Sequence, residues 1–188
     1  MLPFKKNIAC IEGRWVQDFT KPNSVAAGLE LLQNNKIIRK QCCKNSHFKA
    51  TTLDLLLEFT QKRYASYSLL YLSFHGEPGA IGLGKERVTL DELEERLAGK
   101  LTGKILHFGS CQTVNINKRR LTKFLVTTKA AAVSGFTTDV AFLESTLFDL
   151  LYFETCQYRD RVEDIQSDMS TNYGAMSRRL GFRMVIHP

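Results

Sequence analysis

The sequence has few of the features that mark unfolded, membrane-spanning or disulfide-stabilised proteins. Only 4 prolines and 12 glycines occur among 188 residues, and 44% of the residues are hydrophobic, which excludes a disordered or collagen-like chain. No apolar run approaches the roughly 20 residues that a membrane-spanning helix needs. The start, Met1 to Lys6, has two lysines after its apolar residues and no cleavage site of small residues. We therefore expect no signal peptide, no membrane association and a cytoplasmic location.

The cysteines give no sign of a disulfide framework or of a metal site. Five is an odd number and the spacing is irregular, so we expect free thiols, of which at least one is available for chemistry. Cys42, Cys43 and His47 lie close together, but two adjacent cysteines and one histidine do not match a zinc-site spacing. The glycines at 79, 82 and 84 are followed by Arg87 where a nucleotide-binding loop needs its last glycine. We expect neither a metal nor a cofactor.

The positive charge is concentrated at one end of the chain. Of the net charge of +7, residues 1–49 contribute 9 basic and 3 acidic side chains. A basic end can bind nucleic acid or an acidic partner, but no aromatic residues alternate with the basic ones and no nucleic-acid-binding motif is present. A solvated basic face is the first interpretation and a specific anionic partner is the alternative. We do not expect nucleic acid to be the partner.

Apolar periodicity predicts strands that alternate with helices over residues 1–188, which we interpret as a single domain. A helix that carries Val25, Leu29 and Leu32 is expected after Pro22, and a hairpin over 79–88 precedes a helix that starts with a Thr89 and Glu92 capping box. The remaining predicted strands are 7–12, 36–42, 68–74, 104–109, 130–136 and 181–187, and the remaining predicted helices are 51–63, 117–129, 142–158 and 169–180. This order predicts a three-layer α/β/α sandwich around a six-stranded, mainly parallel sheet whose last strand is antiparallel.

Two residues with reactive side chains follow neighbouring predicted strands. The apolar strand 68–74 ends at His75 and Gly76, and the apolar strand 104–109 ends at Ser110 and Cys111. Ligands of open α/β sheets bind beyond the carboxyl ends of the strands, so both side chains can face one crevice. An imidazole beside a thiol can take its proton and later protonate a leaving amine. The amides of Gly76 and Cys111 could bind the oxyanion that forms on the attacked carbonyl.

These two segments resemble the paired signatures of the caspase-like (clan CD) cysteine peptidases, in which one apolar strand ends in His-Gly and another in Ala/Ser-Cys. Within that clan the chain is most similar to CHAT-type and separase-like domains, through residues 79–93 and 133–141. The resemblance covers residues 68–152. It implies a caspase-like fold and a cofactor-free thiol protease that cleaves protein or peptide substrates. It also implies activation by a protein partner or by processing, in a bacterial stress, antiviral defence or cell-death setting.

Asp139 is the candidate residue for substrate specificity. The resemblance places it at the specificity pocket, and the other interpretation is a cap on the helix that begins near Val140. A carboxylate in such a pocket favours a cationic side chain, and the planar guanidinium of arginine can engage it with two hydrogen bonds. The sequence around Cys111 and the 36-residue distance from His75 differ from those of the caspases proper, which argues against their aspartate preference. We expect arginine to be preferred over lysine before the scissile bond, and a small or apolar residue is the main alternative.

Two further interpretations concern His107 and whether the protein is an enzyme or an interaction module. His107 lies inside a predicted buried strand, so we expect a hydrogen-bonded core histidine rather than a catalytic one. The alternative to a peptidase is a catalytically silent caspase-like module that is recruited through its basic surface. The presence of both His75 and Cys111 favours the peptidase, because an interaction module does not need the pair.

Overall fold

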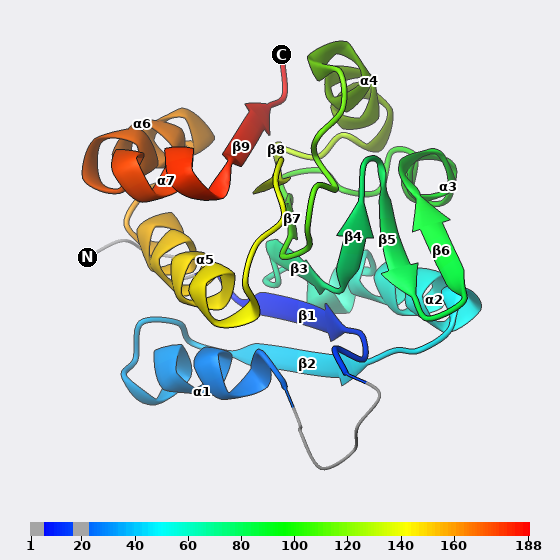
Figure 1. The fold of residues 1–188 in the computed structure, drawn as a ribbon, viewed down its shortest axis with the longest axis horizontal. Coiled ribbons are helices and arrows are strands. Elements are labelled where there is room, and N and C mark those ends of the chain that lie inside the picture. Colours follow the sequence, from blue (N-terminus) through cyan, green and yellow to red (C-terminus); the bar gives the residue numbers. More distant parts are fainter. Residues whose placement is uncertain (1–5, 17–22) are drawn as a thin grey trace.

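The computed structural model describes residues 6–16 and 23–188, and its central element is a six-stranded sheet (Figure 1). The strand order is β2-β1-β3-β7-β8-β9, with the first five strands parallel and β9 antiparallel to β8. The strands are β1 (Ile8–Glu12), β2 (Gln41–Asn45), β3 (Leu69–Ser73), β7 (Ile105–Phe108), β8 (Ala132–Phe136) and β9 (Phe182–Ile186). The predicted mainly parallel sheet with an antiparallel last strand is confirmed.

Helices cover both faces of this sheet and make the three layers. One face carries α2 (Lys49–Phe59), α3 (Leu90–Leu97) and α4 (Lys118–Thr128), and the other carries α1 (Ala26–Asn34), α5 (Phe142–Gln157), α6 (Val162–Asn172) and α7 (Gly174–Leu180). Because side chains alternate along a strand, β1 sends Ala9 and Ile11 into one core and Ile8 and Cys10 into the other. Burial on both faces explains why the central strands are continuously apolar in sequence.

A second, three-stranded antiparallel sheet follows β3. It consists of β4 (His75–Glu77), β5 (Ala80–Leu83) and β6 (Glu86–Thr89). The hairpin predicted over 79–88 is confirmed as β5 and β6, and Gly84 turns between them with a φ of 69°. The sequence did not predict β4, which begins at His75 only two residues after β3 ends.

Three predicted elements have the wrong bounds. The helix expected at 51–63 is α2, which ends at Phe59, and a separate 3-10 helix follows at Lys62–Tyr64. The second strand was expected at 36–42 but lies at Gln41–Asn45, because the amides of Ile37 and Ile38 instead donate to the Leu32 carbonyl at the end of α1 (2.9 and 3.3 Å). Ile38 fills the core there and is 1% exposed. The helix expected at 169–180 is two helices, α6 and α7, which meet at Tyr173, whose φ of −126° is not helical.

Some expectations fall on parts of the chain that lie outside the described residues. These are residues 1–5, which belong to the segment from which we expected no signal peptide, and Pro22, which was expected to precede the first helix. None of the helices that the structure describes has the combined length and apolar character that a membrane span requires.

The predicted capping box at the start of α3 is present. The Thr89 hydroxyl accepts a hydrogen bond from the Glu92 amide (3.3 Å), and the Glu92 carboxylate accepts one from the Thr89 amide (2.9 Å). Lys49 pairs with the same carboxylate and, together with the Thr89 amide, lowers the pKa of Glu92.

Replacing Thr89 with alanine is expected to lower the free energy of unfolding by about 1 kcal/mol, because one amide at the helix start loses its acceptor. Urea denaturation measures the change. Thr89→Ser keeps the hydroxyl and serves as the control. An alanine variant as stable as wild type would contradict this role of the box.

Candidate active site

His75 is exposed at the start of β4 and its ring is held by Trp15. The ring Nε2 lies 2.9 Å from the Trp15 carbonyl oxygen, and the two rings meet edge to face at 5.3 Å between centroids. A carbonyl oxygen only accepts hydrogen bonds, so Nε2 carries the proton in the neutral ring. Nδ1 then has the free lone pair, which is the arrangement that a general base needs.

Trp15 is itself fixed by a buried carboxylate. Glu12, the last residue of β1, is 3% exposed and accepts hydrogen bonds from the Trp15 indole (2.9 Å), the Val25 amide (2.8 Å) and the Ser24 hydroxyl (2.7 Å). Phe142 packs edge to face against the Trp15 ring at 5.0 Å. Sequence reasoning missed Trp15, although the single tryptophan of the chain, three residues beyond a predicted strand, was a signal that could have found it.

Cys111 lies in a turn just beyond β7 that is tied to the neighbouring strands. The Gly109 amide donates to the Leu72 carbonyl of β3 (2.9 Å), and the Gln112 amide donates to the Thr138 carbonyl beyond β8 (3.1 Å). Gln112 has a φ of 54°, so the chain turns sharply directly after the cysteine. The half-buried sulfur accepts a hydrogen bond from the Val140 amide (3.4 Å). Over the ranges 6–16 and 23–188, the Cys111 amide has no hydrogen-bond acceptor.

The segment that carries His75 packs directly against the cysteine turn. A Cβ on Gly76 would overlap the Cys111 carbonyl oxygen and would lie 2.5 Å from Thr113 Oγ1. Thr113 also ties the turn to the second sheet, because its hydroxyl donates to the Ala80 carbonyl (3.1 Å). Since β3 and β7 are paired neighbours, the structure brings the His75 and Cys111 segments to one edge of the sheet, as the sequence predicted. Glycine at position 76 permits this close approach.

Asp139 lies beside the cysteine turn and is exposed. Its Oδ1 accepts a hydrogen bond from the side-chain amide of Gln112 (2.8 Å), and the next residue, Val140, contacts the sulfur. The interpretation of Asp139 as a helix cap is wrong, because α5 begins at Phe142 and its N-cap, Ala141, has no side-chain hydrogen bond. The carboxylate is therefore available to a molecule bound near Cys111.

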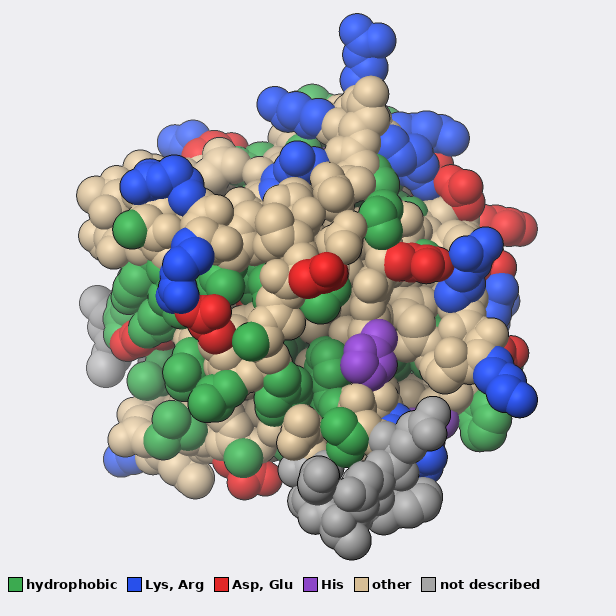
Figure 2. All heavy atoms as spheres, in the orientation of Figure 1, with side chains coloured by type: hydrophobic (Ala, Val, Ile, Leu, Met, Phe, Trp, Pro, Cys, Tyr) green, Lys and Arg blue, Asp and Glu red, His purple; other side chains and the backbone are tan. Residues whose placement is uncertain are grey.

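The polar loop after Cys111 is anchored by the last strand. The Arg183 guanidinium of β9 donates from Nη1 to the carbonyls of Val114 (2.8 Å) and Ile116 (2.9 Å). Arg120, in the first turn of α4, pairs with Asp91 (2.6 Å) and with Glu94. Figure 2 shows basic side chains gathered over α4 with acidic ones beside them on the α3 side.

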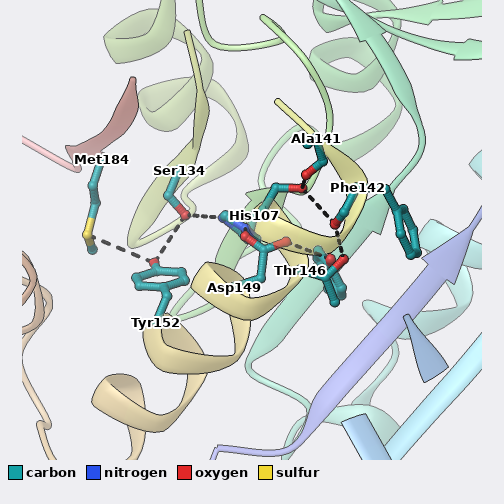
Figure 3. A network of polar contacts seen from close by, with 10 residues as sticks. His107, Ser134, Ala141, Phe142, Thr146, Asp149, Tyr152 and Met184 are labelled. Carbon is teal, nitrogen blue, oxygen red and sulfur yellow. Dashed lines mark hydrogen bonds and ion pairs between the residues drawn. The ribbon is translucent and has the colours of Figure 1, made fainter. Parts of the chain in front are cut away.

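A buried polar network lies beneath the cysteine turn (Figure 3). His107 is fully buried, its Nδ1 lies 2.9 Å from Ser134 Oγ, and its Nε2 lies 2.8 Å from Asp149 Oδ1. The other carboxylate oxygen of Asp149 accepts from the Tyr71 hydroxyl (2.6 Å). A Cβ on Gly109 would lie 2.7 Å from that hydroxyl and 2.9 Å from the carboxylate, so the turn rests on the network. The expected core role of His107 is confirmed.

The five cysteines differ in their surroundings. Cys10 and Cys156 are fully buried, and burial raises the pKa of Cys10 well above its ordinary value and that of Cys156 to about 12. Cys42 and Cys43 are half-buried in the edge strand β2, which pairs with β1 and not with the strands that precede His75 and Cys111. Cys111 alone combines partial exposure with a place beside the His75 segment.

Comparison with known families places the chain in a group defined by sequence. A family model described as a family of unknown function, DUF6642, matches residues 5–186. The chain belongs to this family. A search of curated proteins gave no match. The match to the DUF6642 model spans the whole sheet from β1 to β9, so the His75 and Cys111 segments both lie inside the family's shared region.

Proposed function

We propose that this protein is a cysteine endopeptidase of the caspase-like type, with Cys111 as nucleophile and His75 as general acid and base. The observation that carries the proposal is the packing of Gly76 on the Cys111 turn, which joins the two segments at one edge of the sheet. The hydrogen bond from His75 Nε2 to the Trp15 carbonyl supports it, because it leaves Nδ1 as the proton acceptor.

The proposed reaction proceeds through an acyl-enzyme. His75 Nδ1 takes the thiol proton, and the Cys111 sulfur forms a bond to the carbonyl carbon of the scissile peptide. The amides of Gly76 and Cys111 stabilise the negative charge that moves to the carbonyl oxygen. The carbon–nitrogen bond then breaks as His75 returns the proton to the leaving amine. A water molecule, deprotonated by His75, cleaves the thioester and regenerates the thiol.

Profiling with a peptide library tests this function. Wild-type protein should cleave a subset of peptides at defined bonds, and the Cys111→Ala protein provides the blank. The alternative is a silent module recruited through a basic surface, which the exposed side chains of Arg39, Lys40 and Lys44 favour. Under that alternative no peptide is cleaved, and binding to an acidic protein weakens steeply with added salt.

We propose that the enzyme prefers arginine before the scissile bond and that Asp139 is responsible. Asp139→Ala is expected to lower kcat/KM for an arginine peptide by about 10- to 100-fold, because a charge-assisted hydrogen bond is lost. Matched fluorogenic peptides with Arg, Leu or Asp at that position measure the change.

Asp139→Asn is the sharper variant for this test, since it keeps an oxygen for Gln112 but removes the charge. It should lose the arginine preference as the alanine variant does. Equal rates on all three peptides, or an unchanged preference in either variant, would remove Asp139 from the specificity pocket.

We further propose that the isolated chain has low activity until a protein partner or self-processing activates it, as the resemblance implies. The support is the resemblance to peptidases that are restrained by a fused sensor or a partner. Activity of the purified protein before and after addition of lysate from cells under stress tests this. Full activity without any addition, and with no rise on incubation, would contradict it.

A further inference from the structure

A hollow of about 580 Å³ lies beside His75 on the side of the second sheet. Among the residues that the structure describes, it is lined by Arg14, Trp15, Val16, His75, Gly82 and Gly84. Its size falls within the range of about 300–1,000 Å³ that binding pockets show. Cys111 is not among the lining residues, so the hollow meets only one member of the proposed catalytic pair.

In a peptidase, the position of the hollow beside the histidine alone determines which half of the substrate it can bind. The part of the substrate before the scissile bond becomes attached to the cysteine, whereas the part after it leaves as an amine that receives its proton from the histidine. A hollow that adjoins the histidine without the cysteine therefore suits the departing half. We propose that this hollow binds the side chain of the first residue after the scissile bond and selects a large apolar one; this proposal rests on the proposed peptidase function.

Gly82 keeps the hollow open. It pairs with His75 across the β4–β5 ladder, so the two residues share a face of the second sheet. A Cβ on Gly82 would lie 3.6 Å from the His75 Cβ, which is ordinary contact, and a Cβ on Gly84 would meet nothing within 4 Å. The fold therefore has room for a side chain at position 82, and that side chain would occupy the space proposed for substrate.

The lining determines which side chain fits. Trp15 and Val16 offer apolar surface, and the lining residues of the described chain include a cationic Arg14 but no carboxylate. Among these described lining residues a lysine or arginine of the substrate finds no carboxylate to pair with, and a glycine leaves the apolar surface in water. A leucine or phenylalanine covers that surface, and its burial should tighten binding by about 10-fold or more relative to glycine.

The position of Trp15 supplies a direct optical probe, because it is the only tryptophan of the chain. The Cys111→Ala protein is titrated with dipeptide amides that represent the departing half: Leu-Ala, Phe-Ala, Gly-Ala and Lys-Ala. A saturable change in tryptophan fluorescence is expected with the Leu and Phe amides, at concentrations at least about 10-fold lower than with the Gly or Lys amides. This measurement does not need catalysis.

The second experiment measures the rate of peptide cleavage. Internally quenched peptides that differ only in the residue after the scissile bond are compared on wild type and on Gly82→Leu. Wild type should prefer Leu or Phe over Gly by about 10-fold or more in kcat/KM, and Gly82→Leu should lose both this preference and the fluorescence response. Gly174→Leu, at the start of α7, is the matched control and should keep both, since a Cβ there meets only the flexible end of Arg178.

The fluorescence titration and the cleavage assay together distinguish failure of the proposed pocket from failure of the proposed peptidase function. Turnover without any preference at this position, together with no selective fluorescence change, overturns the hollow and leaves the peptidase standing. A selective fluorescence change that Gly82→Leu abolishes, with no peptide cleaved by wild type, overturns the peptidase but supports an apolar binding site at the hollow. Equal circular dichroism and equal alkylation of Cys111 in wild type and Gly82→Leu establish that the variant is folded.

Discussion

The Cys111→Ala protein is expected to lose peptide hydrolysis by about 10⁴-fold or more while its thermal unfolding stays close to that of wild type. The loss is large because the sulfur forms the covalent bond of the proposed reaction, and a nucleophile knockout removes the whole covalent pathway. The fold is retained because the half-buried side chain contacts the Val140 backbone and the change removes a single sulfur. Progress curves on one cleaved peptide and a melting curve measure the two effects.

Cys42→Ala is the control for this variant, since Cys42 is also half-buried but lies in β2. It should retain full activity. Residual turnover of Cys111→Ala at a tenth or more of the wild-type rate would show that the thiol is not the nucleophile.

Alkylation gives an independent check on the same residue. With limiting iodoacetamide, Cys111 should be modified ahead of the other four cysteines, because a thiol reacts as its thiolate. Burial raises the pKa of Cys156 to about 12, so this group stays protonated and unreactive at neutral pH, and Cys10 behaves likewise. Peptide mass spectrometry identifies the labelled residue. Preferential labelling of Cys42 or Cys43, with activity intact, would contradict the assignment.

Replacement of Asp149 with alanine is expected to lower the free energy of unfolding by about 3–5 kcal/mol. Asp149 is 1% exposed and accepts hydrogen bonds from Tyr71 and His107, so the variant leaves two buried polar groups without their shared partner. Because Gly109 rests on the same atoms, the cysteine turn also loses support and activity should fall. Chemical denaturation and turnover measured below the unfolding temperature separate the two effects.

Two matched variants sharpen this prediction. Asp149→Asn keeps one acceptor oxygen and should cost less than the alanine variant. Asp160→Ala removes an exposed carboxylate between α5 and α6 and should change the stability by no more than about 0.5 kcal/mol. An Asp149→Ala protein within about 1 kcal/mol of wild type would show that the network is not a main source of stability.

Much of the central sheet could be predicted because its strands are buried on both faces. The continuous apolar runs that became β3 and β7 are typical of strands that are covered by helices on both faces. Parallel strands end at the same edge, so the places of His75 and Cys111 followed once these strands were recognised. The edge strand β2 was misplaced because Gln41–Asn45 is mostly polar, whereas Ile37 and Ile38 just before it are apolar and cap the core beneath α1.

The parts of the site that depend on long-range contacts could not be predicted. Trp15 contacts His75 and Phe142, which are far away in the sequence, and no local pattern encodes such a meeting. The strand β4 contains only His75, Gly76 and Glu77, which is too short for an alternating pattern to be recognised. Asp149 is missed for a similar reason, because a carboxylate on a helix normally indicates a solvent-facing position.

The contact between Arg183 and the loop after Cys111 bears on the order in which the molecule is made. A chain that is still being synthesised already has its thiol and its imidazole outside the ribosome when residue 183 has yet to be joined. Until β9 is added beside β8, the carbonyls of Val114 and Ile116 lack the guanidinium that holds them. The loop beside Cys111 therefore reaches its final shape only after residue 183 has been synthesised and β9 has paired with β8.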